Sequence, residues 1–122
     1  MQYDIDTRSP LGEHFKTVRK ILLSYSEIKE LKNPKQTSYS DTHGVIIMMR
    51  TKGKHLVLAF GKGSKLQEKY PQLLGDGKYV RHLYLKQNDS VDESLLREMI
   101  QESIILGLEA YELKKLKCNS RV

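Results

Sequence analysis

The chain has 122 residues, of which 39% are apolar and 30% are charged, and its net charge at pH 7 is +6. This length predicts one domain, residues 1–122, with its own core, and this composition excludes an intrinsically disordered chain. The longest apolar runs, 45–49, 56–60 and 104–108, are far shorter than the roughly 20 residues of a membrane-spanning helix. No membrane segment is therefore expected.

The N-terminal residues lack the basic start and apolar run of a secretory signal. Cys118 is the only cysteine, so neither an internal disulfide nor a cysteine-rich zinc site can form. These features predict a protein of the reducing cytosol.

The positive charge is concentrated in the middle of the chain. Residues 45–88 contain nine Lys and Arg but only two acids, Glu68 and Asp76, for a net charge of +7. The flanking thirds, 1–44 and 89–122, carry +1 and −2. Such a field favours an anionic partner. The alternative is that lysines on strand edges only prevent aggregation.

A first helix is predicted over about residues 10–31. Ser9 is expected to cap it and Pro10 to occupy its first position. The apolar residues recur at helical spacing, and Asn33-Pro34 should end the helix. They are Leu11, Phe15, Val18, Leu22, Tyr25, Ile28 and Leu31.

Three strands should follow, over residues 36–41, 45–51 and 55–60, joined by tight turns at 42–44 and 52–53. The second is apolar at successive positions, which is typical of a central strand. Short turns between neighbouring strands predict an antiparallel meander.

The rest of the chain should contain a short helix from Ser64 to Tyr70, a strand over 79–86 and a long helix over 90–115. Ser90 and Glu93 have the spacing of a capping box. The predicted fold is therefore α+β: an antiparallel sheet of about four strands with two long helices on one face, in the order α-β-β-β-α-β-α.

Two glycine motifs stand out. The first is an F-x-x-G-x-x-L segment and the second a G-x-G-K-x-x-R block. Their residues are Phe60, Gly63 and Leu66, and Gly75, Gly77, Lys78 and Arg81. With these motifs at this separation, about residues 10 to 112 resemble the YdhG-like family, small bacterial proteins usually labelled a domain of unknown function. The resemblance implies an α+β fold and little chemistry. Some relatives are described as frataxin-like iron chaperones.

The second motif is the predicted site. Glycines at 75 and 77 permit a loop whose N–H groups turn inward around an anion. Lys78 and Arg81 would add a point charge and a bidentate fork. Arg81 should share a strand face with Leu83 and Leu85, near the rim of the core, where a guanidinium needs a partner. The partner is either a ligand carboxylate or phosphate, or an internal acid such as Asp76 or Glu68, which would make Arg81 a structural clamp.

No enzymatic chemistry is predicted. The segment 61–65 lacks the spacing of a nucleotide-binding loop, and no serine or cysteine lies in a nucleophile motif. The four histidines have no metal-ligand spacing. We therefore expect no catalytic residue, no metal site and no cofactor.

The favoured function is non-enzymatic binding of a small anion near Gly75, Gly77, Lys78 and Arg81. The first alternative is a frataxin-like iron-binding chaperone using the acids of the last helix, Glu98, Glu102, Glu109 and Glu112. Nucleic-acid binding by the basic middle is the weakest alternative, because aromatic residues total only 7% and no recognised motif is present. A homodimer and a monomer both remain open.

Overall fold

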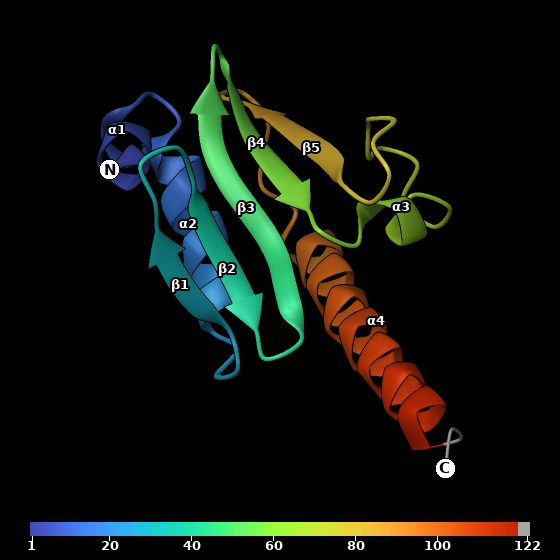
Figure 1. Ribbon diagram of the computed structural model, residues 1–122. Coiled ribbons are helices and arrows are strands. Elements are labelled where there is room, and N and C mark those ends of the chain that lie inside the picture. The colour runs from blue at the N-terminus through green and yellow to red at the C-terminus, as the bar shows by residue number, and fades with distance from the viewer. Residues whose placement is uncertain (120–122) are drawn as a thin grey trace.

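The computed structural model describes residues 1–119 (Figure 1). Its helices are α1 (Gln2–Arg8), α2 (Gly12–Leu23), α3 (Gly63–Leu66) and α4 (Glu93–Asn119). Its strands are β1 (Lys29–Lys32), β2 (Thr37–Asp41), β3 (Gly44–Lys52), β4 (His55–Phe60) and β5 (Arg81–Lys86). The strands form one antiparallel sheet in the order β1-β2-β3-β4-β5.

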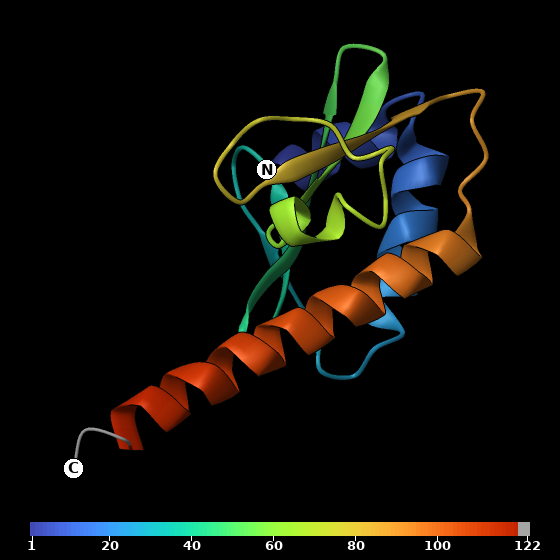
Figure 2. The same cartoon turned by 90° about the vertical axis from the view of Figure 1, so that its right-hand side faces the viewer.

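The predicted fold class is confirmed, with a fifth strand added. Helix α2 and the N-terminal half of α4 lie on one side of the sheet, and the C-terminal half of α4 projects past it (Figure 2). The core fills the space between them; Phe15 and Val18 of α2, Met99 of α4 and Leu58 of β4 are all fully buried in it. The opposite face of the sheet carries no long helix (Figures 1 and 2).

The predicted helix over 10–31 is too long and begins too early. Helix α2 starts at Gly12 and ends at Leu23, where the hydroxyl of Ser24 donates to the carbonyl of Ile21 at 2.6 Å. Residues 29–32 form strand β1 instead. Lys, Glu and Leu favour helices locally, but the paired strand β2 and the Arg19–Glu30 ion pair override that preference.

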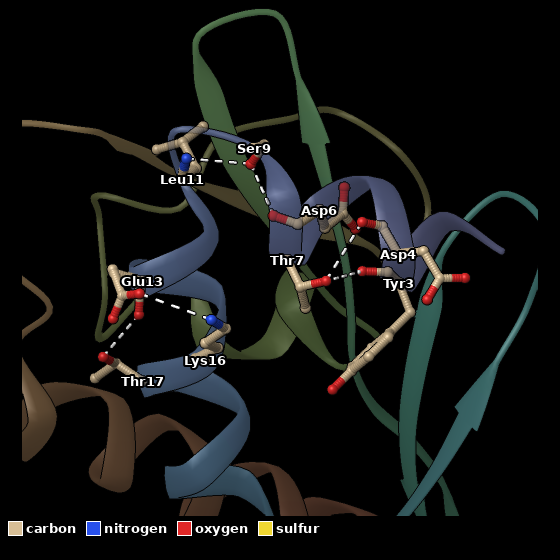
Figure 3. A network of polar contacts seen from close by, with 9 residues as sticks. All are labelled: Tyr3, Asp4, Asp6, Thr7, Ser9, Leu11, Glu13, Lys16 and Thr17. Atoms are coloured by element: carbon tan, nitrogen blue, oxygen red, sulfur yellow. Dashed lines mark hydrogen bonds and ion pairs between the residues drawn. The ribbon is translucent and has the colours of Figure 1, made fainter.

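Helix α1 was not predicted. Figure 3 shows Ser9 at the joint between α1 and α2, where its hydroxyl donates to the Asp6 carbonyl at 2.7 Å and accepts from the Leu11 N–H at 3.1 Å. The Asp6 carboxylate is fully buried, and its Oδ1 accepts from the Thr51 N–H and hydroxyl at 2.9 and 2.7 Å. These contacts attach α1 to β3.

The other predicted boundaries need small corrections. The short helix ends at Leu66 rather than Tyr70, and the last strand begins at Arg81 rather than at 79. The predicted cap Ser90 lies too far upstream. Helix α4 begins at Glu93, and the side chain of Asp92 accepts from the Leu95 N–H at 3.1 Å. Asp92 is therefore the capping residue.

A β-bulge explains the apolar run in β3. Tyr39 of β2 pairs with Ile47 and Ser40 pairs with Val45, which leaves Ile46 as an extra residue. Both Ile46 and Ile47 are buried, because the bulge lets two successive side chains reach the core. Val45 consequently borders the opposite face, beside Met48.

Candidate functional site

The predicted site lies in the loop between α3 and β5. Leu74 and His82 exchange two backbone hydrogen bonds of 2.8 Å, which fold residues 75–81 into a closed turn. The Ser64 N–H donates to the Tyr79 carbonyl at 2.7 Å and ties the turn to α3. Gly75 has φ of +127°, a conformation that side chains oppose. The loop is thus held by backbone hydrogen bonds both to β5 and to α3.

Arg81 holds this loop together. Its Nε donates to Gln67 Oε1 at 2.9 Å, and its Nη1 donates to the carbonyls of Val80, at 2.9 Å, and Gly77. As predicted, Arg81 is on the face of β5 whose residues Leu83 and Leu85 pack against the core. Each of these partners is neutral, and no ion pair found within residues 1–119 involves Arg81. The guanidinium charge is therefore not compensated by Asp76 or Glu68.

Gln67 is a site residue that the sequence did not indicate. Its side-chain oxygen accepts from Arg81, and its side-chain nitrogen donates to the Leu73 carbonyl at 2.9 Å. A glutamine that directly follows a short helix has no sequence signal for such a role. It becomes visible only when β5 is placed beside α3.

The two glycine motifs meet at Arg81. A Cβ on Gly63 would lie 2.3 Å from the Arg81 backbone nitrogen, closer than real Cβ atoms approach anything. Phe60, from the same motif as Gly63, pairs with Arg81 across β4 and β5 and is fully buried. The motifs therefore have a packing role, because they let α3 lie directly against β5.

Lys78 and Gly77 contribute less to an enclosed site. The ammonium of Lys78 lies 5.3 Å from the ring centroid of Tyr79, a cation–π contact at the surface. Gly77 is exposed and has no positive φ. The structure thus brings Gly75, Gly77 and Arg81 together, while Lys78 is directed to Tyr79.

A second candidate site lies on the face of the sheet that the long helices leave open. Two adjoining hollows share Met48 and Val80, and together they are called the sheet-face groove. One is also lined by Gln36, Met49, Arg50, Lys52, Val57, Ala59, His82 and Tyr84. The other is also lined by Val45, Gly61, Lys62, Ser64, Lys65 and Tyr79. Among residues 1–119, the lining includes four Lys and Arg side chains and no Asp or Glu.

Strand register gives the groove three parallel columns. Arg50 of β3 pairs with Val57 of β4, which pairs with Tyr84 of β5. Two residues away on the same face, Met48 of β3 pairs with Ala59 of β4, which pairs with His82 of β5. The basic residues Arg50 and Lys52 therefore lie on one side, small apolar residues in the middle and rings on the other.

The rings are close to one another. The centroid of the Tyr84 ring lies 5.8 Å from that of His55 and 6.1 Å from that of His82. Tyr84 is 41% exposed and Tyr79 is 60% exposed, so both rings are accessible to a partner. Val80, His82 and Tyr84 line the same hollow. This agrees with the predicted face of Arg81, Leu83 and Leu85, because successive side chains of a strand point to opposite faces. The sequence alone does not show that Arg50 and Lys52 of β3 share this face with the rings, because that depends on how the strands pair.

Two of the acids of α4 have partners on the segment after α3. Glu98 accepts from the Tyr70 hydroxyl at 3.4 Å, and Glu102 forms an exposed ion pair of 3.3 Å with Lys69. In the part of the chain that the structure describes, no three His, Cys, Asp or Glu side chains are grouped closely enough to hold a metal ion. Within the same residues, no helix is both long and apolar enough to cross a bilayer.

The structure is similar to that of a protein of the DUF1801 family, YdhG from Bacillus subtilis. The two share 20% sequence identity over 84% of this chain and 86% of that protein, with a TM-score of 0.62. This likeness shows a common fold and agrees with the family resemblance that the glycine motifs indicate. Neither a protein-family model nor a curated protein matches the chain.

Proposed function

We propose that this protein is a non-enzymatic binding protein that holds an anionic partner in the sheet-face groove. The observation that carries the proposal is the sign of the charges: all four ionic side chains that line the groove are basic. They are Arg50, Lys52, Lys62 and Lys65. Charges of one sign gathered around a hollow attract partners of the opposite sign.

Protection of sheet edges does not account for this arrangement. Arg50 and Lys52 belong to β3, the central strand of the five, and both pair with β4. The pairing of β3 with β2 ends at Met49, but beyond it the Thr51 N–H donates to the buried Asp6 carboxylate of α1, so this part of the strand is covered as well. Lysines that prevent aggregation are needed on edge strands. Cations on a central strand, beside half-buried apolar residues, are better explained by a partner that covers the face.

Retention on immobilised heparin, a polyanion, tests the proposal. The double variant Arg50→Gln/Lys52→Gln should elute at clearly lower salt than the parent protein. Lys114→Gln/Lys115→Gln is the matched control, because it removes the same charge from exposed positions near the end of α4. Equal elution of the two double variants would overturn the proposal, since net charge alone would then explain retention.

A small-anion site at the glycine loop is a second candidate. The observation that favours it is the charge of Arg81, whose partners are all neutral oxygens. These bonds use Nε and Nη1, and an anion would be bound through Nη2 beside Gly75 and Gly77. Phosphate or sulfate should then raise the melting temperature of the parent protein but not that of Arg81→Met.

A further inference from the structure

We infer that the partner of the sheet-face groove is a single-stranded nucleic acid. This inference rests on the proposed function and names the chemical class of its partner. Three features of the groove carry it: a row of accessible rings, a parallel row of cations, and small side chains between the two. Composition could not show this, because it does not reveal which residues share a face.

The rings supply a surface for unpaired bases. Tyr84 and His82 of β5 both line the groove with ring centroids 6.1 Å apart, and Tyr84 is 41% exposed. His55 of β4 lies outside the groove lining and packs edge-on against Tyr84. Stacking on such rings needs the flat face of a base, which a duplex keeps inside its own stack. The ring row therefore favours a single strand over a duplex.

The cations supply contacts for the phosphates of the same strand. Arg50 is separated from Tyr84 by one intervening strand, on which Val57 occupies the position between them. Neighbouring strands are about 4.8 Å apart, which places the backbones of the two columns about 10 Å apart. Val57 and Ala59, in the middle column, are small enough to let a polymer lie between the column of cations and the column of rings. Bases on one side and phosphates on the other suit a single strand lying along the groove.

An acidic peptide matches only part of the groove. Its carboxylates would pair with Arg50 and Lys52, but it has no need of the ring row. Dependence on Tyr84 therefore separates the two classes of partner, because base stacking is lost with the ring whereas ion pairs are not.

Fluorescence anisotropy with labelled probes tests the inference. The probes are single-stranded oligo-dT and oligo-U of about 12 nucleotides, a duplex of equal length and a polyglutamate peptide. The parent should bind at least one of the single strands more tightly than the duplex and the peptide. Tyr84→Leu should weaken binding of that strand about 10-fold. The control Tyr111→Leu, which removes an exposed ring from α4, should leave it unchanged.

Three results would overturn the inference. They are tighter binding of the duplex, tighter binding of polyglutamate, and equal affinity of the parent and Tyr84→Leu for the single strands. Failure of the inference and failure of the proposed function are distinguishable. If heparin retention depends on Arg50 and Lys52 but Tyr84 has no effect on single strands, the groove still binds anions and only the nucleic-acid assignment fails.

Discussion

Arg19 and Glu30 form a bidentate ion pair that joins α2 to β1. Arg19 Nε donates to Glu30 Oε2 at 2.6 Å and Nη2 donates to Oε1 at 3.0 Å. The hydroxyl of Tyr39, a fully buried residue of β2, donates to the same carboxylate at 2.8 Å. Glu30 therefore has three charge-assisted hydrogen bonds, which fix an edge strand of only four residues against the helix.

Replacing Glu30 with Gln should destabilise the protein by about 2 kcal/mol, because hydrogen bonds to a charged partner are weakened and Arg19 loses its counter-ion. Urea unfolding followed by circular dichroism measures the change. Glu13→Gln is the control: its ion pair with Lys16 is exposed, 3.7 Å long and local to α2. A Glu30 variant as stable as the control would show that β1 is held by strand pairing alone.

The same residue predicts a pH dependence. Burial raises the pKa of Glu30, but the hydrogen bonds from Arg19 and Tyr39 outweigh burial, and the net effect lowers the pKa. A carboxyl group with a lowered folded-state pKa contributes stability above its unfolded pKa and loses it as the pH falls through the folded value. The stability difference between parent and Glu30→Gln should thus be constant at neutral pH and shrink in acid. A difference that grows on acidification would contradict the assigned direction.

Gly63→Ala should be one of the most damaging single substitutions in the chain. The added Cβ would lie 2.3 Å from the Arg81 backbone nitrogen, so α3 and β5 would have to separate, at a cost of about 3 kcal/mol. Gly77→Ala is the matched control, since its Cβ would be 3.6 Å from the nearest atom, the Val80 carbonyl oxygen. Thermal unfolding of both variants checks the prediction, and comparable melting temperatures would refute it.

Arg81→Met should cost about 2 kcal/mol in the absence of anions. The substitution removes hydrogen bonds to neutral oxygens. A loss of several kcal/mol would require a buried carboxylate to be left unpaired, and within residues 1–119 Arg81 is not bonded to one. Chemical unfolding in an anion-free buffer measures this change. A loss near 4 kcal/mol would mean that Arg81 is paired with an internal acid after all.

Iron binding by α4 is tested by changing Glu98, Glu102, Glu109 and Glu112 together to Gln. Stability should hardly change, because exposed charges contribute little. Calorimetric titration with ferrous iron under anaerobic conditions should give no tight binding for the parent or for the variant. Tight binding that the variant loses would support the iron-chaperone alternative.

The sequence predicts the parts of this fold whose local pattern agrees with their tertiary setting. Residues 55–60 form a strand with the predicted boundaries, because alternating side chains and turn residues both favour it. Residues 29–31 were included in the predicted helix because Tyr25, Ile28 and Leu31 continue its apolar spacing. The interactions that make residues 29–32 a strand come from Arg19 and Tyr39. Long-range contacts of this kind leave no local signal.

For the long helix α4, the sequence predicts the helix but not how much of it is buried. Its apolar spacing predicts burial as far as Leu113, whereas Leu113 is 60% exposed because α4 continues past the end of the sheet (Figure 1). Periodicity identifies an apolar face but does not reveal where its partner ends. The glycine loop was predicted as an anion site with a ligand or an internal acid as the partner of Arg81. The partners found, Gln67 and the carbonyls of Gly77 and Val80, have no sequence signature.

The most direct test that the sheet-face groove binds a single-stranded nucleic acid is a nuclear magnetic resonance titration of the ¹⁵N-labelled protein with a short single-stranded oligonucleotide, recording backbone amide shifts. Binding in the sheet-face groove predicts that the largest changes fall on residues 48–52, 57–59 and 79–84. Residues of α2 and the C-terminal half of α4 should be unaffected. Two results would contradict binding in the groove: shifts confined to the acidic residues of α4, or no shifts at a large molar excess of the oligonucleotide.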